Sequence, residues 1–327
     1  MKERKIRTRP VLLSGSYSPE FTKKVGDYLH LHVHDVRLTR FANSELKVEV
    51  PTVRGADVFV FQSHGASVNE HLVEQAAIIN AARRASARDV TAVVPYRGYG
   101  RADRPDNSHE SYMGPLAMRF LAMAGANRIL EVDPHAGQSA GFLADFTTEY
   151  TAIPAHPAIQ DYLRSLIDGG DPDDVVIVSP DSGRAKLNRR YAARFNKPRA
   201  IIDKMRTGAN KAEVMAIIGQ VAGMRCFVID DMIDTAGTIV EGAEALIKQG
   251  AKEVTVVATH GVLSDPATER LLHAKSSGVI ARVAVTDTLK LPSHMPPEEI
   301  DVISVAPLVG EAIRSIYHNE SVSANFV

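Results

Sequence analysis

The chain has 327 residues, a formal net charge of −1 and one cysteine. These values exclude an internal disulfide and a globally basic nucleic-acid-binding surface, and the length suggests about two domains. A lone cysteine fits a reducing compartment, and no apolar run approaches the roughly 18 residues of a transmembrane helix. The apolar run after the basic first residues spans only Val11–Leu13, which is too short for a signal peptide. We therefore expect a cytoplasmic protein.

Short β-rich runs alternate with longer helical runs in both halves of the chain. The first half predicts strands at residues 11–15, 56–64, 89–96 and 128–135, and helices at 18–31, 69–85 and 114–125. The second half predicts strands at 174–181, 199–204, 225–231 and 252–261, and helices at 185–195 and 238–250. Near-continuous Val and Ile in the strands favour parallel sheets covered on both faces. We expect an α/β fold with two similar domains, residues 1–154 and 155–327.

Polar side chains gather where the predicted strands end. Ligands of open parallel sheets bind at the carboxyl ends of the strands. A purely structural sheet would place turn residues there, whereas this chain places acids, bases and histidines: Arg101, Asp103, Arg104, His135, Asp181, Lys204, Arg206, Asp230, Asp231, Asp234 and His260. The sequence therefore predicts a binding site formed by these strand ends.

The segment 230–238 carries the most specific of these signals. After the acids Asp230 and Asp231, the loop Asp234-Thr235-Ala236-Gly237-Thr238 connects a strand to a helix. Small residues let backbone N–H groups converge at the helix amino terminus, which makes an anion site suited to a phosphate. Carboxylates suit sugar hydroxyls and Mg²⁺ instead. The segment favours a sugar-phosphate site, and the alternative is a helix cap at Asp234 beside a solvated strand end.

Several motifs resemble one enzyme family. VIDDMIDTAGT at 228–238 is similar to the signature that phosphoribosyltransferases share with ribose-phosphate diphosphokinases, also called PRPP synthases. The remaining motifs resemble the diphosphokinases: FANSE (41–45), YRGYGRADR (96–104), DPHAGQ (133–138), VSPDSG (178–183), IIDKMR (201–206), ATHGVLSDPA (258–267) and SVSANF (321–326). The resemblance runs collinearly from about Leu13 to Phe326, and it implies two phosphoribosyltransferase-type domains.

The resemblance implies transfer of the β,γ-diphosphoryl group of ATP to the 1-hydroxyl of ribose 5-phosphate, with Mg²⁺. Lys204 and Arg206 match the family's catalytic loop, and they would neutralise the transferring group. His135 and Asp181 match Mg²⁺-associated positions, although contact through water or to the phosphates suits His135 equally well. Read alone, the two basic residues are a solvated loop and His135 is a structural histidine.

The remaining family positions divide between the two substrates. The carboxyl-terminal half would bind ribose 5-phosphate through Arg206, Asp230, Asp231, Asp234, Thr235, Ala236, Gly237 and Thr238. The amino-terminal half would recognise ATP through Phe41, Asn43, Ser44, Glu45, Arg101 and Ala102. In the family, the loop matching 41–45 reaches into a neighbouring subunit, which implies a homo-oligomer of at least a dimer and usually a hexamer. Read alone, FANSE is only a turn.

Two departures from the family pattern leave other functions open. Ala102 stands where bacterial relatives usually carry Gln, and residues 105–113 lack most of the basic charge of phosphate-activated relatives. We therefore predict weak or absent activation by inorganic phosphate. One alternative is a catalytically silent subunit of a PRPP synthase complex, which retention of Lys204 and Arg206 argues against. Another is a phosphoribosyltransferase, which the FANSE and DPHAGQ elements and the two-domain length argue against.

Overall fold

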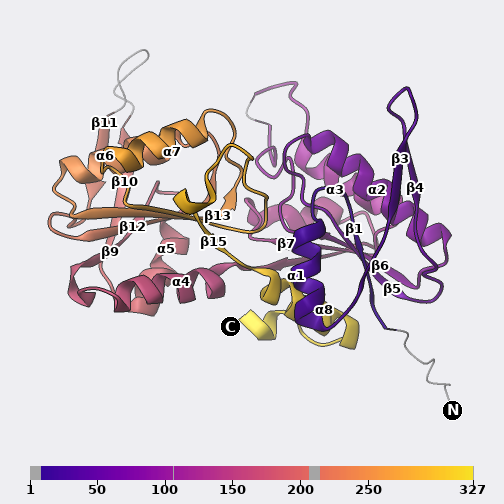
Figure 1. Ribbon diagram of the computed structural model, residues 1–327. Coiled ribbons are helices and arrows are strands. Elements are labelled where there is room, and N and C mark those ends of the chain that lie inside the picture. The colour runs from indigo at the N-terminus through magenta and orange to yellow at the C-terminus, as the bar shows by residue number, and fades with distance from the viewer. Residues whose placement is uncertain (1–8, 106, 206–213, 327) are drawn as a thin grey trace. The chain divides into compact units, whose positions relative to one another are not determined.

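The chain folds into two compact units that each contain a mostly parallel sheet (Figure 1). The structure is a computed structural model that describes residues 9–105, 107–205 and 214–326. The first unit extends to Ala155 and also contains Thr288–Lys290 and the segment from Val305 onward. The second unit contains His156–Asp287 and Leu291–Ser304. The boundary between residues 154 and 155 stays a prediction about independently folding domains, because compactness alone does not test it.

The first unit is built on a sheet of order β2-β1-β5-β6-β7-β8 in which every pair is parallel. Its strands are β1 (Val11–Ser14), β2 (Val33–His34), β5 (Asp57–Phe61), β6 (Asp89–Val94), β7 (Arg128–Val132) and β8 (Glu149–Ile153). Its α-helices are α1 (Pro19–Leu29), α2 (Val68–Arg84), α3 (Met113–Ala124) and α8 (Ala306–His318). The central strands are buried on both faces because α2 packs against α3 on one face and α1 against α8 on the other (Figure 1).

A separate hairpin carries the FANSE segment. Strands β3 (Arg37–Arg40) and β4 (Leu46–Glu49) pair antiparallel and do not join the main sheet. The tip closes through hydrogen bonds from Phe41 N to Glu45 O (2.9 Å) and from Ser44 N to Phe41 O (2.9 Å), with Ser44 in the left-handed region at φ 70°. Figure 1 shows the hairpin standing out from the unit beside α2. The segment is therefore the exposed end of a β-ribbon.

The last helix completes the first unit. The Tyr28 Oη of α1 donates a hydrogen bond to Glu311 Oε1 of α8 at 2.6 Å. Gly310 allows this close approach, because a Cβ there would lie 2.4 Å from Cδ1 of the Tyr28 ring. Residues that are 283 positions apart in the chain therefore form one helix–helix contact.

The second unit has the sheet order β11-β10-β9-β12-β13-β14-β15. Its strands are β9 (Val175–Ser179), β10 (Arg199–Met205), β11 (Val214–Ile218), β12 (Arg225–Ile233), β13 (Glu253–Gly261), β14 (Arg282–Thr286) and β15 (Asp301–Ile303). All pairs are parallel except β10 with β11 at the edge. Helices α6 (Gly237–Lys248) and α7 (Ala267–Ser276) lie on one face, and α4 (His156–Asp168) and α5 (Ala185–Phe195) on the other (Figure 1).

The predicted α/β fold class, with mostly parallel sheets covered by helices on both faces, is confirmed. Four short 3₁₀ helices complete the described elements: η1 (Gly137–Leu143), η2 (Pro172–Asp174), η3 (Pro297–Glu299) and η4 (Ser323–Phe326). Within the part of the chain that the structure describes, no helix combines the length and apolar character needed to cross a bilayer.

Candidate functional site

In the first unit, the loops after β6 and β7 bring together three predicted site residues. A Cβ at Gly100 would lie 3.8 Å from Cβ of His135, so the loop that carries Arg101 and Ala102 packs against the loop that carries His135. Gln138 Nε2 also donates to Asp103 Oδ2 at 2.6 Å and joins the same two loops. Arg101, Ala102 and His135 therefore lie on neighbouring loops at the carboxyl end of the sheet.

The predicted ATP residues of the hairpin project away from the sheet. Phe41 is 57% exposed although it is aromatic. Arg40 donates to Ser44 O at 3.2 Å and pairs with Glu70 of α2 at 2.9 Å, which fixes the tip relative to that helix. This exposed aromatic ring at the tip of the β-ribbon is accessible to another surface.

In the second unit, Asp230 and Asp231 lie within β12 and share one arginine. The strand continues to Ile233, so the two acids do not end it as the sequence predicted. The Arg184 guanidinium pairs with Asp231 through Nη2 and lies with Nε 3.5 Å from Asp230 Oδ1. Only 16% of the Asp230 side chain and 7% of the Asp231 side chain are exposed. Burial and the adjacent Asp231 carboxylate raise the pKa of Asp230.

Helix α5 links the strand that carries these acids to the strand that precedes Asp181. The buried side chain of Asn188 on α5 donates through Nδ2 to Val178 O at 3.2 Å and to Ile229 O at 2.9 Å. This amide therefore joins the end of β9 to the middle of β12, and these strands carry the VSPDSG and VIDD motifs. Asp181 follows β9, and its Oδ1 accepts from Arg184 N at 2.9 Å, so the turn that presents Asp181 also positions Arg184.

The loop 234–238 has the backbone of an anion site. Ala236 adopts the left-handed conformation (φ 61°) immediately before α6 begins at Gly237, which turns successive N–H groups to one side. Arg270 of α7 donates through Nη1 to Thr235 O at 3.0 Å, and a Cβ at Gly237 would lie 3.1 Å from the same nitrogen. The residue immediately before α6 is Ala236, so the N-cap position falls on Ala236 and not on Asp234.

The remaining predicted residues are less fully defined. Lys204 lies on β10 opposite Met215 of β11, and Arg206 lies outside the described residues. His260 is buried on β13 opposite Met232 of β12, so it belongs to the sheet interior. Among the described residues, no three His, Cys, Asp or Glu side chains form a ready metal cluster. A Mg²⁺ ion here would take few protein ligands and complete its octahedron with water and substrate oxygens, which suits an isolated carboxylate such as Asp181.

Sequence reasoning missed Arg184, Asn188 and Arg270. Arg184 had a usable signal, because it follows the VSPDSG motif directly. Asn188 and Arg270 sit within ordinary amphipathic helices, and their role depends on backbone carbonyls that only the folded sheet and loop provide.

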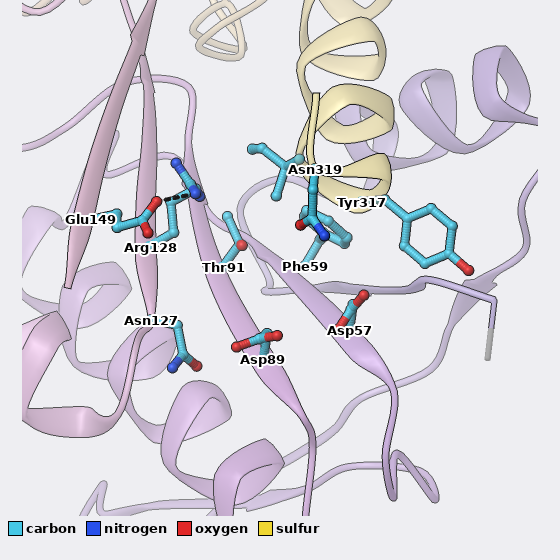
Figure 2. A pocket seen from close by; sticks show the side chains of 10 residues that line it. Asp57, Phe59, Asp89, Thr91, Asn127, Arg128, Glu149, Tyr317 and Asn319 are labelled. Carbon is cyan, nitrogen blue, oxygen red and sulfur yellow. Dashed lines mark ion pairs between the residues drawn. The ribbon is translucent and has the colours of Figure 1, made fainter. Parts of the chain in front are cut away.

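A cavity of about 180 Å³ in the first unit lies apart from all of the predicted site residues. It opens at the amino ends of β5 to β8 beside the end of α8 (Figure 2). Its charged side chains pair with one another or with a neighbour: Arg128 pairs with Glu149, and Asp57 pairs with Arg88. Because these charges are already satisfied and lie at the end of the sheet opposite the site loops, the cavity is not the predicted site.

The fold and these loops define a chain with two phosphoribosyltransferase-type α/β units, and comparison with known proteins identifies the family. Residues 10–125 match the model for the N-terminal domain of ribose phosphate pyrophosphokinase, and residues 193–327 match the phosphoribosyl synthetase-associated domain. The chain belongs to the ribose-phosphate pyrophosphokinase family, so the family resemblance is confirmed.

Three relatives show how far the similarity extends. The chain is 43% identical to ribose-phosphate pyrophosphokinase 2, chloroplastic, of Spinacia oleracea over 98% of its length and 79% of the relative's. It is 42% identical to the ribose-phosphate pyrophosphokinase of Synechococcus elongatus, over 96% of its length and 93% of the relative's. The crystal structure of phosphoribosylpyrophosphate synthetase from Mycobacterium smegmatis matches with a TM-score of 0.86 and 36% identity, covering 95% of this chain and all of that one.

Proposed function

We propose that the protein is an active ribose-phosphate pyrophosphokinase, which transfers the β,γ-diphosphoryl group of ATP to the 1-hydroxyl of ribose 5-phosphate and releases PRPP and AMP. The observation that carries this proposal is the match to pyrophosphokinases over nearly the whole chain, in both units. A phosphoribosyltransferase would need only the second unit's loop. The first unit's match to the pyrophosphokinase N-terminal domain therefore favours the diphosphokinase.

In the second unit, the loop 234–238 would hold the 5-phosphate of the sugar. The N–H groups around Ala236 and Gly237 supply donors, and the amino terminus of α6 adds a favourable dipole. Asp230 and Asp231 would accept hydrogen bonds from the ribose hydroxyls, and Arg184 keeps the pair from repelling in a largely buried place. This arrangement fixes the 1-hydroxyl for attack on the β-phosphorus of ATP, which is the positioning that phosphoryl transfer requires.

In the first unit, Arg101 and the backbone around Ala102 would contact ATP, with Phe41 and Asn43 to Glu45 supplied by the hairpin of a second copy. The exposure of Phe41 supports this arrangement. We propose a homo-oligomer, a hexamer built from dimers as the family resemblance implies, because each ATP site would need a neighbour's hairpin. Location in the cytoplasm stays a prediction.

Lys204 and Arg206 would neutralise charge on the transferring diphosphoryl group. Removing one such donor costs about 10²–10³ in rate. His135 in the first unit and Asp181 in the second would each contact Mg²⁺, directly or through water, and each suits an ion that keeps most of its ligands as water and phosphate oxygens. When bound, Mg²⁺ neutralises the phosphates of ATP and orients them for in-line transfer.

A ³¹P NMR time course tests this function. Purified protein is mixed with ATP, ribose 5-phosphate and Mg²⁺ in buffer free of inorganic phosphate, and we expect AMP and PRPP to appear together at equal rates. Release of ADP or inorganic phosphate instead would contradict diphosphoryl transfer. Silence both with and without added phosphate would favour the silent-subunit alternative. The matched control is Lys204→Ala, which should lose about 10²–10³ in rate and still bind ribose 5-phosphate.

A further inference from the structure

A buried charged network lies at the base of two loops of the first unit, residues 97–104 and residues 133–139. Arg97 is the third residue after the end of β6. It donates through Nε to Glu131 Oε2 of β7 at 2.9 Å. The side chains are 0% and 3% exposed, respectively. Tyr150 of β8 donates its Oη to the same Glu131 oxygen at 2.9 Å. Burial and the Glu131 carboxylate raise the pKa of the Tyr150 phenol, so it stays a donor at neutral pH.

The network continues upward into the loop that carries His135. Arg97 Nη2 donates to Ser139 Oγ at 3.1 Å, and Ser139 Oγ donates to Ala136 O at 2.9 Å. Ala136 follows His135 in the chain. A Cβ at Gly100 would lie 4.0 Å from Arg97 Nη2 and 3.8 Å from Cβ of His135, so the guanidinium also lies beside the turn that leads to Arg101. One side chain therefore reaches both loops.

Stability alone gives a poor account of this network. Placing two charges inside a protein carries a desolvation cost that can exceed their attraction, and well-packed apolar residues often serve as well or better. Arg97 Nη1 is buried and makes no hydrogen bond to the described residues, so the guanidinium is not fully satisfied. The planar guanidinium of arginine can donate to two acceptors at once in a fixed geometry, which an aliphatic side chain cannot do.

We propose that Arg97, fixed by Glu131 and Tyr150, is a positioning residue that sets the 97–104 loop against the 133–139 loop and so aligns Arg101 with His135 for ATP. The inference rests on the proposed function for the identity of the nucleotide. It goes beyond that function because Arg97 and Glu131 would touch neither substrate. A network with a merely structural role would instead affect stability and leave nucleotide binding unchanged.

The decisive variant replaces the whole network with apolar residues: Arg97→Met, Glu131→Leu and Tyr150→Phe together. Removing both charges and the hydroxyl at once leaves no unpaired buried group, so the triple variant should fold with an unfolding midpoint equal to or above that of the wild type. We expect KM for ATP to rise about tenfold and KM for ribose 5-phosphate to stay within about twofold, because only the loops of the first unit lose their alignment. A stable triple variant with an unchanged KM for ATP would overturn the proposal.

Two further variants separate positioning from general effects. Arg97→Lys keeps the charge opposite Glu131 but has one nitrogen in place of a fork, so it should show an intermediate KM for ATP. The matched control is Asp57→Asn with Arg88→Met, which removes a part-buried ion pair at the amino end of the same sheet (Asp57 is labelled in Figure 2). The control should leave both KM values unchanged. If it raises KM for ATP equally, the effect of the triple variant is not specific to the loops.

Hydrogen exchange distinguishes failure of this proposal from failure of the proposed function. If the wild-type protein makes no PRPP, the function fails, but the loops can still be examined directly. The triple variant should show faster amide exchange in 97–104 and 133–139 than the wild type, and unchanged exchange in 234–238. Equal exchange in all three segments would overturn the positioning role whatever the enzyme activity.

Discussion

In each unit the predicted site loops lie at the carboxyl end of that unit's own sheet. The charged residues that hold these loops differ between the two units. In the first unit, the charges that organise the loops are buried beneath them: Arg97 and Glu131 are inaccessible to solvent or nearly so. In the second unit, the organising charges belong to the site itself, because Arg184 pairs with the acids that we propose as ribose contacts, and it retains 20% exposure.

The two sites should therefore respond differently to the loss of an ion pair. A buried pair below a loop acts through geometry, so its loss should change how a ligand is aligned. A pair that includes the binding groups acts through charge, so its loss should change both stability and binding of the sugar.

The largest effect is expected from Arg184→Met in the second unit. Removing this cation leaves the largely buried Asp231 carboxylate without its ion-pair partner, and we expect a loss of about 3 kcal/mol in the free energy of unfolding. Urea unfolding followed by far-UV circular dichroism measures it. Adding Asp231→Asn should recover much of the loss, because one negative charge is removed. A single variant as stable as the wild type would show that charge does not organise this unit.

A pH effect of similar size is expected from His64 in the first unit. This fully buried imidazole donates through Nε2 to Gln75 Oε1 (2.9 Å) and accepts at Nδ1 from Gly98 N (3.3 Å), and burial lowers its pKa to about 4. The pKa of His64 is lower in the folded state than in the unfolded state. At pH values between these two pKa values, the imidazole is protonated in the unfolded state and neutral in the folded state. Stability is therefore full above about pH 6.5 and is lost as the pH falls towards 4, by up to about 3 kcal/mol.

The variant His64→Gln isolates this contribution. Urea unfolding at several values between pH 4.5 and 7 should show a steeper loss of stability in the wild type than in the variant on acidification. Parallel pH profiles would mean that His64 does not titrate as its burial indicates, and that the base of the 97–104 loop is better hydrated than the packing suggests.

A smaller effect is expected from Arg270→Met. Losing the hydrogen bond to Thr235 O should loosen the loop 234–238 and raise KM for ribose 5-phosphate about 5- to 10-fold, or 1–1.4 kcal/mol, with KM for ATP unchanged. Steady-state kinetics with each substrate varied in turn provide the measurement. Glu269→Gln, which changes the neighbouring exposed residue on α7, is the control and should behave as the wild type. An equal rise in both KM values would point to damage beyond the loop.

The smallest effect is expected from inorganic phosphate. In the segment 105–113, Asn107 donates to Glu110 on an exposed surface, and the carboxylate disfavours an anion there. We expect the rate of PRPP formation to stay nearly flat as phosphate is raised at constant ionic strength. A steep rise would show that the first unit contains an anion site that its local charge does not reveal.

Much of the architecture and the class of chemistry could be predicted from the sequence. Alternating β-rich and helical runs specify parallel sheets, because such strands need helical crossovers and burial on both faces. The small-residue loop after Asp230 and Asp231 predicts a phosphate site, because converging N–H groups need small side chains there, and this site stays a proposal. The antiparallel β11 and the extension of β12 to Ile233 were missed, since pairing at a sheet edge depends on neighbours far along the chain.

Only the tertiary structure decided which polar groups meet. Arg97 and Glu131 are 34 residues apart, and Arg270 and the Thr235 carbonyl are 35 apart, so no local pattern links them. Helix α8 packs against α1 through Tyr28 and Glu311 across 283 residues. Hydrophobic periodicity predicts which face of a helix or strand is buried, because that face is set by the spacing of apolar residues along the chain. The register of adjacent strands decides which buried charge finds its partner, and that register exists only once the sheet has formed.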